Sequence, residues 1–293
     1  MSSHSQLSYD SYLRVWDLLK LQQPLSKPEA HDELQFIIVH QVYELWFKLL
    51  LHEVRSTIQH LQGGEVGPAF WLMRRCIEIG RVLIQQIHVM ETMSPAKFLE
   101  FRDLLKPASG LQSAQFRVLE CLSGIKDDRY LQLYASFPEA RRQLEEALQA
   151  PTLWDGFCAL LQQRGFKVED HESQLNSLVT IYTEAQHLDL HQLAEAFIEY
   201  DEAFRIWRTR HYLMAERMIG FKPGTGVAHT AQISQDPSPA DGCPMGHGAL
   251  PRTESGPSFQ EPGVRYLQSR ADLRYFPALW EMRSRLGGGY GAS

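Results

Sequence analysis

The residues best suited to chemistry in this sequence are two histidines in apolar, helix-forming stretches. His40 lies within FIIVHQVYELWF, one helical turn after Phe36, so the spacing places an imidazole and an aromatic ring on one helix face. His211 lies within FRIWRTRHYLMAERMIGF among bulky side chains, and a neutral imidazole on a rigid helix is a common protein ligand of haem iron. Each histidine can also be a packed core residue bonded to a backbone carbonyl, and the residues alone favour that second interpretation.

A third candidate is Arg102, which follows Phe98 by one turn in PAKFLEFRDLL. Its planar guanidinium suits a carboxylate ligand, although an arginine on a helix face is more often solvated or paired with a neighbouring carboxylate. The segment GFKPGTG at 220–226 is rich in glycine but lacks the lysine-serine ending of a phosphate-binding loop. We therefore expect a mobile lid there, with Thr225 presenting its hydroxyl inward.

Helical periodicity dominates the segments that must position these residues. From Asp32 to Leu61, apolar residues recur at i, i+3 and i+4 without Gly or Pro, which predicts a helix of roughly 45 Å. Two more long helices are expected, from about 68 to 93 and from about 188 to 219, and no segment shows convincing strand alternation. The sequence therefore predicts an all-α fold, a bundle of long and mostly antiparallel helices. Shorter helices are expected after Ser94-Pro95, near 113–122, 137–149, 152–164 and 173–187, and within 264–286.

Composition and charge argue against several classes of protein. The chain has 293 residues, of which 44% are hydrophobic and 22% charged, as in ordinary globular proteins. Its net charge of −6 provides no basic field for nucleic acid. The start lacks the features of a secretory signal, and no apolar run approaches the length of a membrane span. The four cysteines have no paired spacing, so we expect a cytoplasmic location with neither nucleic acid nor membrane as partner.

Five blocks of this sequence resemble the tryptophan 2,3-dioxygenase family. They span nearly the whole chain in the family's order, and their combination is highly specific. The resemblance implies an all-helical, homotetrameric enzyme that uses haem b and O2 to open the indole ring of L-tryptophan. The blocks are YDSYLRVWDLL (9–19), HDELQFIIVHQVYELWFKLLLHE (31–53), FRDLLKPASGLQSAQFRVLE (101–120), WRTRHYLMAERMIGFKPGTG (207–226) and RYLQSRADLRYFPALW (265–280).

The resemblance also implies a role for each candidate residue. His211 matches the proximal ligand of the haem iron, and His40 matches the distal histidine that faces the indole N–H. Arg102 matches the residue that pairs with the substrate carboxylate, and Thr225 the one that binds its ammonium and carboxylate. The other matches are the walls of the indole pocket (Phe36, Phe98), the distal loop beside bound oxygen (Ser109, Gly110), a propionate contact (Arg117), and an N-terminal segment that reaches into a neighbouring subunit's pocket (Tyr9, Tyr12, Leu13).

Two departures from the family pattern bear on the outcome of the reaction. Ile87-His88 stands where we expect an aromatic and then a small polar residue near the haem, so His88 is either a tolerated variant or reshapes the pocket or contacts a propionate. The chain also carries an insertion at roughly 228–262, rich in Gly, Pro and Ser. We expect a single domain over 1–293, with this insertion partly disordered and a flexible tail at 287–293. Alternatively, Cys243 and His247 in DGCPMGHG belong to a lid that binds a metal or a second haem.

Three functions are compatible with the sequence. The leading one is haem-dependent cleavage of the indole C2–C3 bond of L-tryptophan by O2, giving N-formylkynurenine. The two departures favour a second, a haem monooxygenase of a modified tryptophan or related aromatic amino acid in a biosynthetic pathway. The third is a haem-binding sensor without catalysis. In the first case His40 either orients the substrate or also moves a proton.

Overall fold

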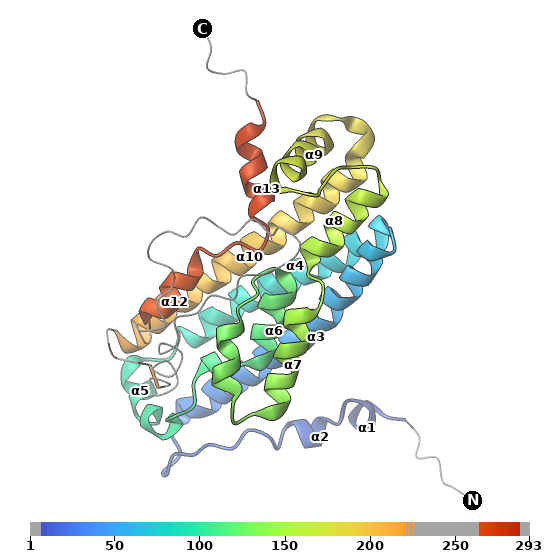
Figure 1. Ribbon diagram of the computed structural model, residues 1–293. Helices are drawn as coiled ribbons and strands as arrows, with labels where there is room; N and C mark the ends of the chain where they lie inside the picture. Colours follow the sequence, from blue (N-terminus) through green and yellow to red (C-terminus); the bar gives the residue numbers. More distant parts are fainter. Residues whose placement is uncertain (1–6, 221, 223, 226–263, 288–293) are drawn as a thin grey trace, which may run out of the picture.

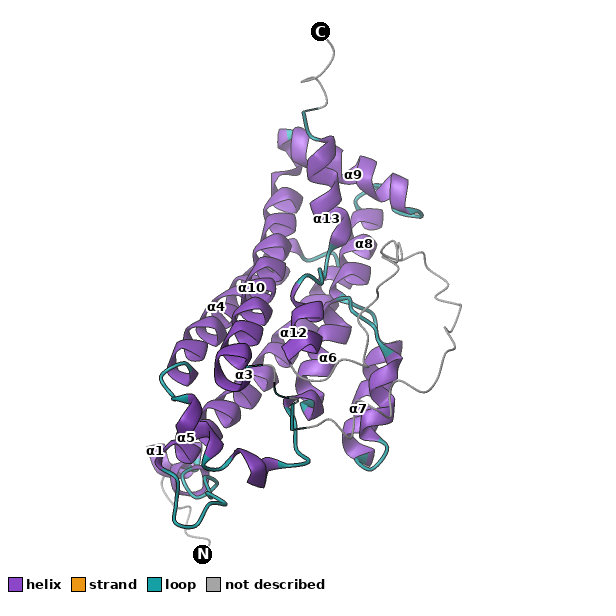
Figure 2. Cartoon of the chain, turned by 90° about the vertical axis from the view of Figure 1, so that its left-hand side faces the viewer, coloured by secondary structure: helices purple, strands orange, loops and turns teal. Residues whose placement is uncertain are grey.

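The computed structural model describes residues 7–220, 222, 224–225 and 264–287. Within these residues every regular element is a helix, and none is a strand (Figure 2). The prediction of an all-α fold with long packed helices is therefore confirmed. The insertion at 228–262, with Cys243 and His247, and the end of the tail at 288–293 lie outside the described residues, so the predictions made for them are not tested.

Three long helices form the body of the molecule (Figure 1). They are α3 (His31–Gln62), α4 (Val66–Met90) and α10 (Leu188–Ile219). Helix α4 packs against both others along its length. The turn after α3 is short because Gly64 adopts a φ of 77°, a left-handed conformation that suits glycine, so α4 runs back along α3. At Gly80 an added Cβ would lie 3.2 Å from the Cβ of Ala203, so this glycine permits the close approach of α4 and α10.

Shorter helices enclose the opposite side of α3 and the ends of α10. Helices α6 and α8 pack against α3, α12 packs against α10, and α13 packs against α9 (Figure 1). Two 3₁₀ turns, Arg102–Leu105 and Gly110–Gln112, join α5 to α6. The shorter helices are α5 (Pro95–Leu99), α6 (Ala114–Ser123), α7 (Pro138–Gln149), α8 (Leu153–Gln163), α9 (His171–Thr183), α12 (Val264–Ala271) and α13 (Pro277–Met282).

Local capping explains where several of the shorter helices begin. The Ser94 side chain accepts a hydrogen bond from the backbone N–H of Lys97, and Pro95 occupies the first turn of α5, as the sequence predicts. The helix expected at 173–187 begins earlier, because Asp170 and Ser173 form a reciprocal capping box that starts α9 at His171. It also ends earlier, at Thr183, and a separate 3₁₀ turn follows.

Helix α3 is the most apolar of the long helices. By length and composition it alone, among the helices of the described residues, could span a membrane, which corrects our expectation that no apolar run approaches that length. However, α3 packs against α4, α6 and α8, and Tyr43 and Phe47 lie in the central core. These contacts are typical of a core helix. Part of its apolar surface, at Leu34, Ile38 and Leu45, is exposed in the single chain.

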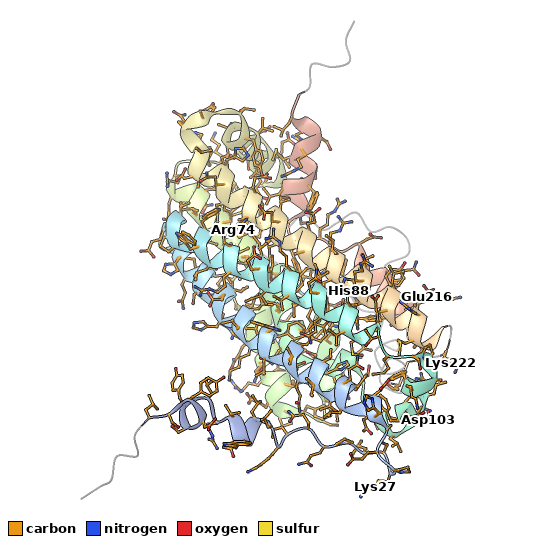
Figure 3. The ribbon with its side chains drawn as sticks, turned by 180° about the vertical axis from the view of Figure 1, so that it is seen from behind. Lys27, Arg74, His88, Asp103, Glu216 and Lys222 are labelled. Atoms are coloured by element: carbon orange, nitrogen blue, oxygen red, sulfur yellow. The ribbon has the colours of Figure 1, made fainter. Side chains whose placement is uncertain are left out.

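The N-terminal segment projects from the bundle rather than joining it (Figures 1 and 3). It contains two short helices, α1 (Tyr9–Leu13) and α2 (Val15–Leu18), with no buried residue. It is anchored where it reaches α3: the buried Glu33 carboxylate accepts hydrogen bonds from the backbone N–H groups of Leu25 and Ser26 and from the Ser26 hydroxyl. The base of the segment is thus held on α3, while α1 and α2 extend away from it.

Candidate active site

A large cavity lies between α3, α10, α12 and the segment from α5 to α6. It contains about 1700 Å³ of empty space, a figure that includes open solvent at its mouth. Nine of the residues singled out in the sequence line it: Phe36, His40, Phe98, Arg102, Ser109, Gly110, Arg117, His211 and Thr225.

His40 is held in one tautomer by its own helix. Its Nδ1 lies 2.7 Å from the carbonyl oxygen of Phe36, which can only accept a hydrogen bond, so Nδ1 carries the proton. The His40 side chain is open to the cavity, yet the surrounding protein desolvates its charged form and lowers the pKa of His40, although the Phe36 carbonyl and the Glu44 carboxylate act in the opposite direction. The imidazole is therefore neutral near pH 7, and its Nε2 is a hydrogen-bond acceptor on a side chain that lines the cavity.

Three phenylalanines form an aromatic wall beside His40. The rings of Phe36 and His40 have centroids 4.1 Å apart, and Phe36 stacks on Phe98 at 5.8 Å with an interplanar angle of 30°. Phe101, which is fully buried, meets both phenylalanines edge-on at 5.4–5.6 Å. Sequence reasoning found Phe36 and Phe98 but missed Phe101, which packs against both rings on the side away from the cavity and fixes their orientation. The wall presents an apolar surface suited to a flat ring.

Arg102 lies in the cavity wall at the start of a 3₁₀ turn. Its side chain is buried, and the two carboxylates next to it in sequence have other partners. Asp103 forms an ion pair with Lys106, and Glu100 forms one with Lys97. The position of Arg102 in the cavity wall suits the capture of a ligand carboxylate.

His211 occupies a different part of the cavity, on α10. Burial, together with the fields of His40 and Arg117, lowers its pKa to about 4. The ring is therefore neutral, the form that binds a metal. It stacks parallel to Trp207, with centroids 5.3 Å apart and an interplanar angle of 6°, and apolar side chains around it line the cavity: Phe47, Phe116, Met214 and Met218.

Buried charge gathers at one side of the cavity. The Arg117 Nη1 donates to Glu120 Oε2 at 2.5 Å, and Arg270 Nη2 approaches both oxygens of Glu120 at 3.4 Å. All three side chains are at least nine-tenths buried. Burial alone would raise the pKa of Glu120, but the surrounding arginines outweigh it and lower that pKa. Asp127 lies 3.7 Å from Arg270 and is itself bound by Arg129.

A third buried arginine, Arg208, leaves this cluster with surplus positive charge. Its Nη2 donates to the carbonyl oxygen of Leu273, and among the described residues no carboxylate forms an ion pair with it. Its Nε and Nη1, and the Nε atoms of Arg117 and Arg270, are buried without a hydrogen-bond partner. Burying a guanidinium without an anion costs several kcal/mol, so this wall is suited to a ligand that carries carboxylates. The propionates of haem fit that requirement, and His211 fits its iron.

Comparison with known proteins identifies the family. A model of that family, described as tryptophan 2,3-dioxygenase, matches residues 1–155. A tryptophan 2,3-dioxygenase from Nocardioides sp. (strain ATCC BAA-499 / JS614) is 43% identical over 96% of both chains. This chain belongs to the tryptophan 2,3-dioxygenase family. Tryptophan 2,3-dioxygenases from Caulobacter vibrioides and Myxococcus xanthus are 35% and 34% identical, over 96% and 95% of this chain and 98% and 89% of their own lengths.

The structure bears on one of the two departures from the family pattern. Neither Ile87 nor His88 lines the cavity, which favours a tolerated variant over a residue that reshapes the pocket. Ile87 is fully buried in the core between helices, whereas His88 is exposed on α4 (Figure 3) and its Nδ1 lies 3.1 Å from Glu91. Consecutive helix residues point about 100° apart, so only one of the pair can face inward, and that one packs in the helix interface.

The N-terminal residues are not brought to the cavity of their own chain. Tyr9 and Tyr12 are 74% and 73% exposed and Leu13 is 47% exposed, and none lines the cavity. Thr225 does reach it, and its hydroxyl donates to the carbonyl oxygen of Ala108 at 2.6 Å. Residues 224–225 are thereby tied to the distal loop.

Sequence reasoning missed several charged residues near His211. Arg208 lies one turn before His211 on α10 and could have been found from that spacing. Glu120 lies one turn after Arg117, so it could have been found in the same way. Arg270 had no comparable signal, because it follows the insertion and reaches Glu120 only in the folded chain.

Proposed function

We propose that this chain is a haem-dependent dioxygenase that cleaves the indole C2–C3 bond of L-tryptophan with O2 and releases N-formylkynurenine. The observation that carries the proposal is that one cavity combines three side chains. These are the neutral His211 among apolar residues, the neutral His40 beside the aromatic wall, and the buried Arg102. The family membership and the near full-length relatives support the same activity.

Haem b is the cofactor in this proposal. His211 would ligate its iron, and Arg117, with Arg208 and Arg270, would hold its propionates. When bound, haem supplies the activation of O2 and the difficult oxidation. The protein contributes an imidazole that burial keeps unprotonated, and a cluster of buried arginines whose positive charge the propionates neutralise.

The substrate is bound by residues of opposite character. Arg102 pairs with the carboxylate of L-tryptophan, and the stack of Phe36 and Phe98 holds the indole ring. The Nε2 of His40 accepts the indole N–H, since its Nδ1 proton is already used by the Phe36 carbonyl. The hydroxyl of Thr225 donates to Ala108, so its oxygen retains lone pairs that can accept from the ammonium group.

The assembly in this proposal is a homotetramer in the cytoplasm. The exposed segment with Tyr9, Tyr12 and Leu13 would complete the pocket of a neighbouring subunit, alongside Ser109 and Gly110 of the distal loop. Exposed apolar side chains on α3, and Trp71 of α4, which is 73% exposed, support an interface between subunits. The three cysteines in the described residues, Cys76, Cys121 and Cys158, are free thiols, consistent with a reducing compartment.

The monooxygenase alternative loses part of its motivation. His88, one of the two departures that suggested it, does not line the cavity. The other departure lies outside the described residues. We therefore keep cleavage of L-tryptophan as the conclusion.

The product mass tests this function. Purified ferrous holoprotein with O2 and L-tryptophan should give a product heavier by two oxygen atoms. Gain of one oxygen atom would establish the monooxygenase, and haem binding without turnover of any indole would establish the sensor. The His211→Ala variant should lose the ordinary Soret spectrum, with the exposed His88→Ala as the matched control. Normal haem content in His211→Ala would refute the assignment of the iron ligand.

A further inference from the structure

Glu44 is a carboxylate in the cavity wall that the proposed chemistry does not use. It lies on α3 one turn after His40, is half-buried, and lines the cavity. Among the described residues it forms no ion pair. Its Oε1 instead accepts a hydrogen bond from the Ser113 hydroxyl at 2.6 Å, and its Oε2 accepts one from the Gln115 amide at 2.8 Å.

The same amide also reaches the backbone of α3. Gln115 Nε2 donates to the carbonyl oxygen of Glu44 at 2.9 Å, so both hydrogens of the amide are directed at one residue. A residue that receives three hydrogen bonds from a neighbouring segment, two on its side chain and one on its backbone carbonyl, fixes the position of that segment relative to its own helix. Here the segment is the start of α6 and the turn before it.

Ser113 connects this contact to the distal loop. It ends the 3₁₀ turn Gly110–Gln112, and its hydroxyl caps α6 by accepting from the N–H of Phe116. The turn is stiff internally, because the N–H of Ser109 donates to the Gln112 side chain and the N–H of Leu111 donates to the Ser109 hydroxyl. A stiff turn that is anchored at Ser113 moves as a unit with its anchor. The turn is also tied to the rest of the chain by the longer bond from the Tyr134 hydroxyl to the Leu111 carbonyl, at 3.3 Å.

We propose that Glu44 is a positioning residue that sets the distance between His40 and the Ser109–Gly110 wall by binding Ser113 and Gln115. The proposal rests on the proposed function, in which His40 and this wall face the same substrate. Helix α3 carries both His40 and Glu44, so one rigid element holds the indole acceptor and the anchor of the opposing loop. No contact of Glu44 with the substrate is required.

A charge effect is the competing explanation, since the Glu44 carboxylate lies close enough to His40 to influence it. Two substitutions separate the explanations. After Glu44→Gln the side-chain oxygen can still accept from Gln115, and the new amide can donate to the Ser113 hydroxyl, so the geometry survives without the charge. Glu44→Leu retains the size but removes both bonds.

The test combines kinetics with a spectroscopic readout that needs no turnover. We expect Glu44→Leu to lower kcat/KM for L-tryptophan by about tenfold, mainly through KM, because the substrate must then order the loop on binding. The C–O stretch of the ferrous carbon monoxide complex should broaden, because it senses the polar groups of the distal side. Glu44→Gln should remain within about twofold of the parent in kcat/KM, with a narrow stretch.

A double-mutant cycle isolates the contact. If Glu44 acts through Gln115, the pair Glu44→Leu with Gln115→Ala should be no worse than the worse single variant. Gln163→Ala is the matched control, because that glutamine amide also donates to a backbone carbonyl of α3, at Gln62, but outside the cavity. It should change neither readout.

Two results would overturn the proposal. An equal loss in Glu44→Gln and Glu44→Leu would show that charge acts rather than position, and parent-like kcat/KM and C–O stretch in Glu44→Leu would show that Glu44 has no role. If Glu44→Leu fails to fold, Glu44→Gln and Gln115→Ala still decide between the explanations. If the holoprotein does not oxidise tryptophan, the proposed function fails, while the C–O stretch still tests the position of the loop.

Discussion

Replacing Glu120 by glutamine should lower the thermal stability of the apoprotein more than that of the holoprotein. In the ligand-free chain Glu120 is the carboxylate that contacts both Arg117 and Arg270, at 2.5 Å and 3.4 Å, and Arg208 stands near it without an anion of its own. The substitution keeps the size of the side chain and removes its negative charge. Among the described residues, Arg117 and Arg208 then have no close carboxylate in this wall, and Arg270 keeps only Asp127, at 3.7 Å.

The size of the effect follows from burial. Breaking a buried ion pair by neutralising one partner costs about 3–5 kcal/mol, and the glutamine oxygen can still accept one bond from Arg117, so we take about 3 kcal/mol. At roughly 2 °C per kcal/mol for a chain of this size, Tm of the apoprotein should fall by about 6 °C. The propionates supply new anions to the same arginines, so the fall in the holoprotein should be less than half as large.

Thermal unfolding of apoprotein and holoprotein at equal concentration measures both values. A ligand that binds only the folded state stabilises it by an amount set by its affinity. Because the difference in Tm between holoprotein and apoprotein should be larger in Glu120→Gln than in the parent, the variant should also bind haem more tightly. Arg208→Gln is the matched opposite: it removes a cation without a carboxylate partner, so it should spare the apoprotein and weaken haem binding. Equal losses in both forms of Glu120→Gln would refute the inference that propionates neutralise this cluster.

Three further outcomes follow from single contacts. His40→Ala should keep its haem but lower kcat/KM for L-tryptophan by about tenfold, as expected for one lost hydrogen bond, and should leave a ring-N-methylated analogue unaffected; an equal loss with that analogue would contradict the acceptor role. Because burial lowers the pKa of His40, a pH–rate profile of the parent should show the loss of kcat/KM from protonation of His40 at a lower pH than an ordinary histidine would give. Asp201→Ala removes the buried acceptor of the Trp280 indole and two backbone N–H groups, so urea unfolding should show about 3 kcal/mol of destabilisation, equal in apoprotein and holoprotein. His88→Ser breaks only the pair of His88 with Glu91, so it should change the free energy of unfolding by less than about 0.5 kcal/mol and leave the Soret band unchanged. A shifted Soret band would show that His88 affects the haem site.

The helices could be predicted because their causes are local. The apolar spacing within α3, the serine-proline start of α5 and the glycine that ends α10 all act within a few residues along the chain. The same locality explains the small errors, since the capping box that begins α9 at His171 is a pair of polar side chains that periodicity does not register. Chemistry alone left His40 and His211 as two of twelve histidines, and only the pattern of surrounding residues singled them out.

What the sequence by itself determined, then, is the set of helices and, through its resemblance to the family, the candidate residues on them. The tertiary structure decided which of those residues share a cavity and which side chains support them. His88 lies outside because the rotation of α4 about its axis is set by packing against α3 and α10. The contacts of Glu44 with Ser113, and of Arg270 with Glu120, join positions 69 and 150 residues apart. Such contacts arise only when helices pack, because their partners are distant in the chain and share no local periodicity.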